Sequence, residues 1–264
     1  MSISITEQFA QLKASGSKAL IPFITAGDPD LDTTWAALQA LDDNGADVIE
    51  LGVPYSDPLA DGSVIQAAAT RALQKGTRLD AILAGLAGLS LKAPVVLFTY
   101  YNPIYRAGLD PFMAKVRQAG CSGLVVPDLP VEESQPLIDA ARAHELDVIL
   151  LVAPTSTPER MHQIAQRSSG FIYLVSTTGV TGQRQTLATR IPELLGSLRQ
   201  QTSLPIGVGF GISSPDQARQ VVDWGADAAI VGSAFVQRLA QAATPAEGIQ
   251  AVGSFCRELK TALG

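Results

Sequence analysis

Short apolar segments rich in β-branched residues recur along the whole chain, and each is followed by a turn and a stretch of helical periodicity. The eight segments lie at residues 19–26, 47–54, 94–101, 123–130, 147–154, 171–178, 205–212 and 227–234. Their apolar positions run on without the alternation that marks a strand with one solvated face. We therefore predict strands buried on both faces, which is typical of a parallel sheet covered by helices.

Helix-forming segments fill the intervals between these strands. Several begin with Asp, Ser or Thr beside a proline and several end at glycine, and both kinds of residue cap helices. Representative segments are PDLDTTWAALQALDDNGA, EESQPLIDAARAH and SPDQARQVVDWGA. Strand and helix thus alternate from end to end, and no shift in composition marks a linker.

About eight strand–helix units in one chain favour a closed barrel. We predict that residues 1–264 form one domain of the α/β class, a (β/α)8 TIM barrel, with an open doubly wound sheet as the alternative. The segment TEQFAQLKAS precedes the first strand and predicts an extra N-terminal helix over the barrel floor. The longest connection, residues 55–93, predicts a loop and two helices.

The charge balance limits the classes of partner. The chain carries 19 basic and 25 acidic residues, a formal net charge of −6, and no run of lysine or arginine. A nucleic-acid surface or a contact with an anionic membrane is therefore not expected. No apolar run reaches the length of a membrane span, and the two cysteines form neither a metal spacing nor a disulfide framework. We expect a cytoplasmic protein.

Three carboxylates follow the second predicted strand, in the sequence ELGVPYSDPLADG. Glu50 lies at the C-terminal end of that strand, where TIM barrels carry their chemistry. Apolar surroundings would raise the pKa of Glu50 and make it a usable general acid and base; the alternative is a carboxylate that caps a helix or pairs with an arginine. Asp61 precedes a helix expected near Ser63, so capping is an equal alternative to a catalytic role. For Asp57 the residues alone favour a turn.

Glycine-rich sequences follow the last three predicted strands: GVTG at 179–182, GVGFGIS at 207–213 and VGSA at 231–234. In TIM barrels these loops and the N-terminus of a short helix commonly hold a phosphate through backbone N–H groups. We expect Gly211, Gly232 and Ser233 to bind the phosphate, with Gly182 closing from the loop above. The alternatives are tight turns for the glycines and a helix cap for Ser233.

Absent residue types narrow the chemistry further. The lysines all lie outside the predicted strand ends, so no amine is available for a Schiff-base aldolase mechanism. His144 and His162 lie in helical segments, where a surface position is expected, and no His/Cys cluster indicates a metal site. The residues predict an enzyme that acts on a phosphorylated substrate with carboxylates, without a metal or a cofactor of its own.

Five motifs together resemble the tryptophan synthase alpha chain family over essentially the whole length: IELGVPYSDPLADG, LFTYYNP, VVPDLPVEES, GVTG and GVGFGIS. The resemblance implies a (β/α)8 barrel lyase that cleaves indole-3-glycerol phosphate to indole and glyceraldehyde 3-phosphate in a retro-aldol step. It also implies that the indole passes to a beta chain in an α2β2 complex of tryptophan biosynthesis. Pyridoxal phosphate (PLP) would belong to the beta chain.

The resemblance also assigns roles to residues. Glu50 would shuttle protons, protonating C3 of the indole and accepting the proton of the glycerol hydroxyl. Asp61 would accept the indole N–H and stabilise positive charge on the ring. The substrate pocket would include Phe23, Tyr173, Thr181, Gly182, Gly211, Gly232 and Ser233. The surface for the beta chain would include Asp57, Asn102, Asp128 and Pro130, which replaces the turn-only interpretation of Asp57.

The polar segment 176–190 is expected to form a lid, with Thr181 as its contact with the catalytic end. Two positions depart from the family's pattern. Ser63 stands where many relatives have proline, which predicts a looser loop around Asp61. Thr177 stands where many have arginine, which affects the details of lid closure.

Three other functions are compatible with parts of this pattern. One is a lyase of the same family that works without a beta chain. Another is a non-catalytic barrel that only activates a PLP-dependent partner, but Glu50 or Asp61 should then be lost, and both are present. A phosphosugar epimerase or isomerase would share the phosphate loops, but it would require a metal-binding His pair or a Lys or His at a strand end.

Overall fold

The computed structural model describes residues 3–175, 184–209 and 211–264, and for residues 184–189 it describes the backbone only. Within these ranges nine parallel strands form one sheet, in the order β5-β4-β3-β2-β1-β9-β8-β7-β6. The strands are β1 Ala19–Thr25, β2 Ile49–Gly52, β3 Val95–Phe98, β4 Cys121–Val125, β5 Asp147–Ile149, β6 Leu151–Val152, β7 Ile172–Val175, β8 Ile206–Gly209 and β9 Ala228–Val231.

The sheet closes into a ring because β5 and β6 are two parts of one predicted strand, interrupted at Leu150. β5 pairs with β4, and β6 pairs with β7. The Leu150 carbonyl still accepts a hydrogen bond from the Tyr173 N–H, at 3.1 Å. All eight predicted strands are present, and the prediction of a (β/α)8 TIM barrel is confirmed.

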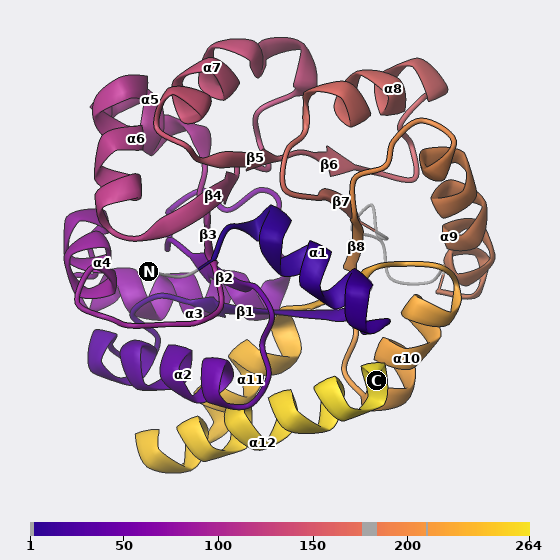
Figure 1. Cartoon of the computed structure of the whole chain (residues 1–264). Coiled ribbons are helices and arrows are strands. Elements are labelled where there is room, and N and C mark those ends of the chain that lie inside the picture. The colour runs from indigo at the N-terminus through magenta and orange to yellow at the C-terminus, as the bar shows by residue number, and fades with distance from the viewer. Residues whose placement is uncertain (1–2, 176–183, 210) are drawn as a thin grey trace.

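Helices surround this ring and alternate with its strands (Figure 1). After α1, Ile5–Ser15, they are α2 Leu31–Asp43, α3 Ser63–Gln74, α4 Leu79–Leu86, α5 Tyr101–Ala107, α6 Leu109–Gln118, the 3-10 helix η1 Val131–Glu133, α7 Gln135–Ala143, α8 Pro158–Arg167, α9 Arg184–Arg199, α10 Pro215–Asp223, α11 Ser233–Gln241 and α12 Pro245–Leu263. The long connection after β2 holds the two predicted helices, α3 and α4. Among the described helices, none is long and apolar enough to cross a membrane.

The predicted N-terminal helix covers one end of the ring. α1 begins with a capping box in which Ser4 and Glu7 bond each other's backbone N–H groups. Its buried residues Ile5, Phe9 and Leu12 belong to the same apolar cluster as the side chains inside the barrel. Figure 1 shows α1 lying across the ring. Because α1 closes this end, only the opposite end, where the strands finish, is left for a site inside the barrel.

The alternation of side chains along β2 decides which of them enter the barrel. Val48 belongs to the interior cluster, whereas Ile49 and Leu51 pack in the layer between the strands and the helices. Glu50 therefore faces the interior, near the C-terminal end of its strand. An ionisable side chain thus lies inside the barrel near the C-terminal ends of the strands, where TIM barrels carry their active sites.

Candidate active site

Glu50 is a buried carboxyl at the mouth of the barrel. The residue is 1% exposed, and neither carboxyl oxygen has a hydrogen-bond partner among the described residues. Burial raises the pKa of Glu50 to about 8. The alternatives of a helix cap or an arginine pair are therefore wrong. A buried carboxyl without a partner requires an explanation, and a site for a reacting ligand is a common one.

Asp61 lies in the loop after β2, immediately before α3. Gly62 occupies the N-cap of α3 and the cap has no side-chain hydrogen bond, so the capping alternative for Asp61 is wrong. The backbone of Asp61 is held at both ends: its N–H donates to the Pro58 carbonyl at 3.1 Å, and its carbonyl accepts from Gln66 Nε2 at 2.8 Å. Burial raises the pKa of the Asp61 carboxyl to about 6. The Asp61 carboxyl is thus partly buried in the loop and does not cap α3.

Tyr100, which lies in the motif LFTYYNP, supports Asp61, although the sequence pattern assigned it no role of its own. Its hydroxyl oxygen accepts a hydrogen bond from the Ala60 N–H at 2.9 Å. Its ring stacks on Tyr55, with centroids 4.9 Å apart and planes 22° apart. Hydrogen bonding to this hydroxyl opposes the rise in the pKa of Asp61. Tyr100 therefore ties the end of β3 to the Asp61 loop and positions the carboxyl.

Tyr173 faces both carboxyls from the far side of the barrel. It is on β7, and its ring lies against Gly209 of β8, where a Cβ atom would be 2.9 Å from the hydroxyl oxygen. The close approach explains the need for glycine at this position. The pKa of the Tyr173 phenol is raised well above its usual range, first by burial and then by the negative charges of Glu50 and Asp61. Tyr173 therefore belongs to the same site.

Phe23 supplies a second aromatic wall. It lies in β1, near the C-terminal end of the strand, and pairs in register with Glu50 on β2. Its ring packs edge-on against Phe98, with centroids 5.5 Å apart and planes 83° apart. Gly52 admits this ring, because a Cβ atom there would be 2.4 Å from Phe23 Cζ. Flat apolar side chains thus lie beside Glu50.

The expected phosphate residues lie at the same end of the barrel. Gly232 is the N-cap of α11 and Ser233 is its first residue, so the alternative of a capping serine is wrong. A Cβ atom on Gly232 would be 3.7 Å from Phe23, so this helix start lies next to the Phe23 ring. Gly211 has φ +59°, with open space where a Cβ atom would be. The Phe235 N–H already donates to the Gly232 carbonyl, at 2.9 Å, so the N–H groups of Ser233 and Ala234 are the ones at this end of α11 that can receive an anion.

Thr181 and Gly182 lie outside the described residues, as does Thr177. The same holds for most of the expected lid, residues 176–190, of which only the backbone of α9 from Arg184 and the side chain of Arg190 are described. Arg190 Nη2 donates to the Pro154 carbonyl at 3.1 Å. The lid and its contact through Thr181 stay predictions.

The four expected partner residues are all exposed, on the segments that follow β2, β3 and β4: Asp57, Asn102, Asp128 and Pro130. Asp128 also has a local structural role, because its carboxylate accepts a hydrogen bond from the Tyr101 N–H at the start of α5, at 2.9 Å. Two large apolar side chains that sequence reasoning missed lie on the same segments. Leu59 is 88% exposed and Tyr105 is 72% exposed. Apolar side chains this exposed are often covered by a partner.

The arrangement defines a class of protein. It is a TIM-barrel enzyme in which two carboxyls with pKa values raised to different extents lie near the aromatic residues Phe23 and Tyr173, at the end of the barrel where α11 begins. Such pairs divide acid and base work between them. Among the described residues there is no group of three or more His, Cys, Asp or Glu side chains that could hold a metal ion.

Comparisons with known proteins identify the family. The profile described as "Tryptophan synthase alpha chain" matches residues 9–264. The chain is 62% identical over 261 residues to the tryptophan synthase alpha chain of Thermosynechococcus vestitus, covering 98% of this chain and 97% of that protein. It is 63% identical over 262 residues to that of a Picosynechococcus species, covering 98% and 99%. The chain belongs to the tryptophan synthase alpha chain family, whose members are lyases.

Solved structures agree with this assignment. A structure of Mycobacterium tuberculosis tryptophan synthase superposes with a TM-score of 0.89 at 39% identity, covering 100% of this chain and 99% of that chain. Tryptophan synthase subunit alpha from Legionella pneumophila superposes with a TM-score of 0.86 at 37% identity, covering 98% and 97%. The fold is thus shared along nearly the whole chain.

Proposed function

We propose that this chain, acting as a single barrel domain, cleaves indole-3-glycerol phosphate to indole and glyceraldehyde 3-phosphate. One observation carries the proposal: burial raises the pKa of Glu50 to about 8 and that of Asp61 only to about 6. Near pH 7, about nine-tenths of Glu50 is protonated and about nine-tenths of Asp61 is ionised. Glu50 can therefore donate a proton while Asp61 carries a negative charge.

These protonation states suit a retro-aldol step. Protonated Glu50 delivers its proton to C3 of the indole ring, and the ring becomes a cation with its charge on the nitrogen. Ionised Asp61 accepts a hydrogen bond from the indole N–H and stabilises that cation. The Glu50 carboxylate then takes the proton of the adjacent glycerol hydroxyl. The aldehyde forms, the carbon–carbon bond breaks, its electrons return to the ring, and Glu50 is protonated as before.

The remaining pocket residues fit the two ends of this substrate. The aromatic side chains of Phe23 and Tyr173 would lie against the flat, apolar indole ring. The first turn of α11, with Gly232 and Ser233, and the open backbone at Gly211 would hold the phosphate. Thr181 and Gly182 would add contacts from the lid. Backbone N–H groups explain how an acidic protein binds a dianion without a basic patch.

The exposed residues at the barrel mouth are candidates for contact with a partner chain. We propose that Asp57, Asn102, Asp128 and Pro130, with the apolar Leu59 and Tyr105, contact a tryptophan synthase beta chain in an α2β2 complex. Indole released at Glu50 would then pass to the beta chain, which would hold the PLP. This chain would need no cofactor, because the proposed step only moves protons and breaks one carbon–carbon bond.

The pH dependence of indole release tests the two assignments. We expect kcat/KM to rise with pH as Asp61 ionises near its pKa of about 6, and to fall as Glu50 loses its proton near its pKa of about 8. Activity should peak near pH 7. The measurement is the initial rate of indole release at low substrate across this range. A rate that stays level through pH 9 would mean that Glu50 is not the acid.

The variant Gly232→Ala tests the phosphate site. The added methyl would be in ordinary contact with Phe23 and Ile65, 3.7 Å away, so the barrel should fold normally. It would shield the N–H groups of the first turn of α11 from the phosphate. KM should therefore rise about tenfold, which corresponds to the loss of one hydrogen bond to a charged group. The variant Gly196→Ala, at an open position in α9, is the matched control. If both variants bound glycerol phosphate with equal affinity, the phosphate site would not be at Gly232.

A further inference from the structure

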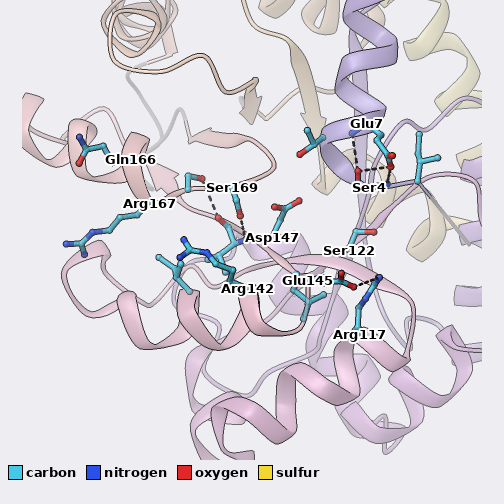
Figure 2. Close-up of a pocket in the computed structure, with 16 residues that line it drawn as sticks. Ser4, Glu7, Arg117, Ser122, Arg142, Glu145, Asp147, Gln166, Arg167 and Ser169 are labelled. Atoms are coloured by element: carbon cyan, nitrogen blue, oxygen red, sulfur yellow. Dashed lines mark hydrogen bonds and ion pairs between the residues drawn. The ribbon is translucent and has the colours of Figure 1, made fainter.

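A cavity of about 620 Å³ lies at the end of the barrel opposite to the catalytic mouth (Figure 2). This volume is in the range of small-molecule sites, about 300–1,000 Å³. Its walls come from the start of α1, the last turns of α6 and α7, the beginnings of β4 and β5, and the segment that leads into β7. The cavity is thus built from parts of the chain that do not take part in the proposed reaction.

The positive charge on the lining is only partly neutralised. Arg117 pairs with Glu145 at 3.5 Å, and Arg167 Nη1 donates to the Val131 carbonyl at 2.7 Å. Arg142, on the last turn of α7, has no hydrogen-bond or ion-pair partner for its guanidinium among the described residues. Figure 2 shows it in the lining with Asp147 and Ser169. One cation on the cavity wall is therefore left for a ligand.

A carboxyl on the same lining also lacks a counter-ion. Asp147 begins β5 and is half-buried. Its Oδ2 atom is packed close to Gly170, where a Cβ atom would be 3.2 Å away. Burial raises its pKa, hydrogen bonding to Ser169 opposes the rise, and no charged side chain contributes to the shift. No ion pair joins Asp147 to Arg142 or to any other described residue.

The lining also has an apolar part. Ile138, Leu146 and Val148 belong to the wall between α7 and β5. The hydroxyl group of Ser122, at the start of β4, adds a polar contact on the other side. A ligand that satisfies this cavity has an anionic group for Arg142, a cationic group for Asp147 and a small apolar body.

We propose that this cavity binds a free α-amino acid with an apolar side chain. Its carboxylate pairs with the Arg142 guanidinium, and its ammonium group pairs with the Asp147 carboxylate. Its side chain lies against Ile138 and Leu146. Bound there, the amino acid leaves the mouth at Glu50 open, so the ligand and the substrate can be held at the same time.

Calorimetric titration of the full chain with L-leucine tests the proposal. We expect one saturable site with a Kd on the order of 1 mM, the affinity of a ligand held by exposed charges. Leucinamide, which lacks the carboxylate, and 4-methylpentanoate, which lacks the ammonium group, should each bind at least about fivefold more weakly. The variants Arg142→Met and Asp147→Asn should weaken leucine binding by a similar factor.

The control variant is Arg78→Met, because Arg78 is an exposed arginine before α4, away from the cavity. It should bind leucine as the unchanged chain does. The rate of indole release should be the same in Arg142→Met as in the unchanged chain, which separates this site from the catalytic one. Absence of a saturable signal for leucine, or equal binding of leucine and leucinamide, would overturn the proposal.

Discussion

Replacing Glu50 with glutamine should remove nearly all turnover and leave substrate binding intact. The amide has the shape of the protonated carboxyl, which is the main form of Glu50 near pH 7 because its pKa is about 8. It cannot give a proton to C3 or take one from the hydroxyl. A positioned proton transfer contributes about 10²–10⁴-fold, and Glu50 would perform two in the proposed reaction, so kcat should fall by at least about 10³-fold.

The measurement for Glu50→Gln is kcat for indole release together with Kd for glycerol phosphate, which reports the phosphate end of the site. Kd should stay within about twofold, because the proposed phosphate contacts lie on α11 and not on β2. The control is Glu193→Gln, on an exposed position of α9, which should be fully active. Full activity of Glu50→Gln would remove Glu50 from the mechanism.

Replacing Asp61 with asparagine should give the second largest loss, about 10²–10³-fold in kcat. The asparagine oxygen can still accept the indole N–H, but it has no negative charge to stabilise the cation formed by protonation at C3. The rise of kcat/KM near pH 6 should disappear with the carboxyl, while the fall near pH 8 should remain because Glu50 is unchanged.

The variant Tyr100→Phe separates the charge of Asp61 from its position. It keeps the carboxylate but removes the hydroxyl that lowers the pKa of Asp61 and accepts the Ala60 N–H. The rise in the pH profile should therefore move to higher pH without being lost.

If Asp61→Asn retained both normal turnover and the rise near pH 6, the negative charge of Asp61 would not be part of the mechanism.

The sequence predicted the strands well because continuous apolar runs demand burial on both faces. It did not predict where the strands end. The run at residues 147–154 is apolar throughout, yet it divides at Leu150, since its halves pair with different neighbours. Tyr101 was predicted at the end of a strand but begins α5, where Asp128, distant in sequence, accepts its N–H. Such boundaries depend on contacts that a local pattern does not contain.

For the same reason, the local geometry of the candidate site residues was predictable to different degrees. Glu50 is anomalous within an apolar run, so its sequence position alone indicated a special role. The capping alternative for Asp61 could be rejected only when the backbone showed Gly62 at the N-cap. Tyr100 was missed because its contact with the Asp61 loop exists only after β2 and β3 are placed side by side.

The most direct test of the proposed lyase is the release of indole from indole-3-glycerol phosphate by the purified chain, with and without a tryptophan synthase beta chain. We predict indole and glyceraldehyde 3-phosphate in equal amounts, slow release by the chain alone, and faster release when the beta chain is added. Fast release that the beta chain does not change would indicate a lyase that works alone. No release under either condition would contradict the proposed reaction.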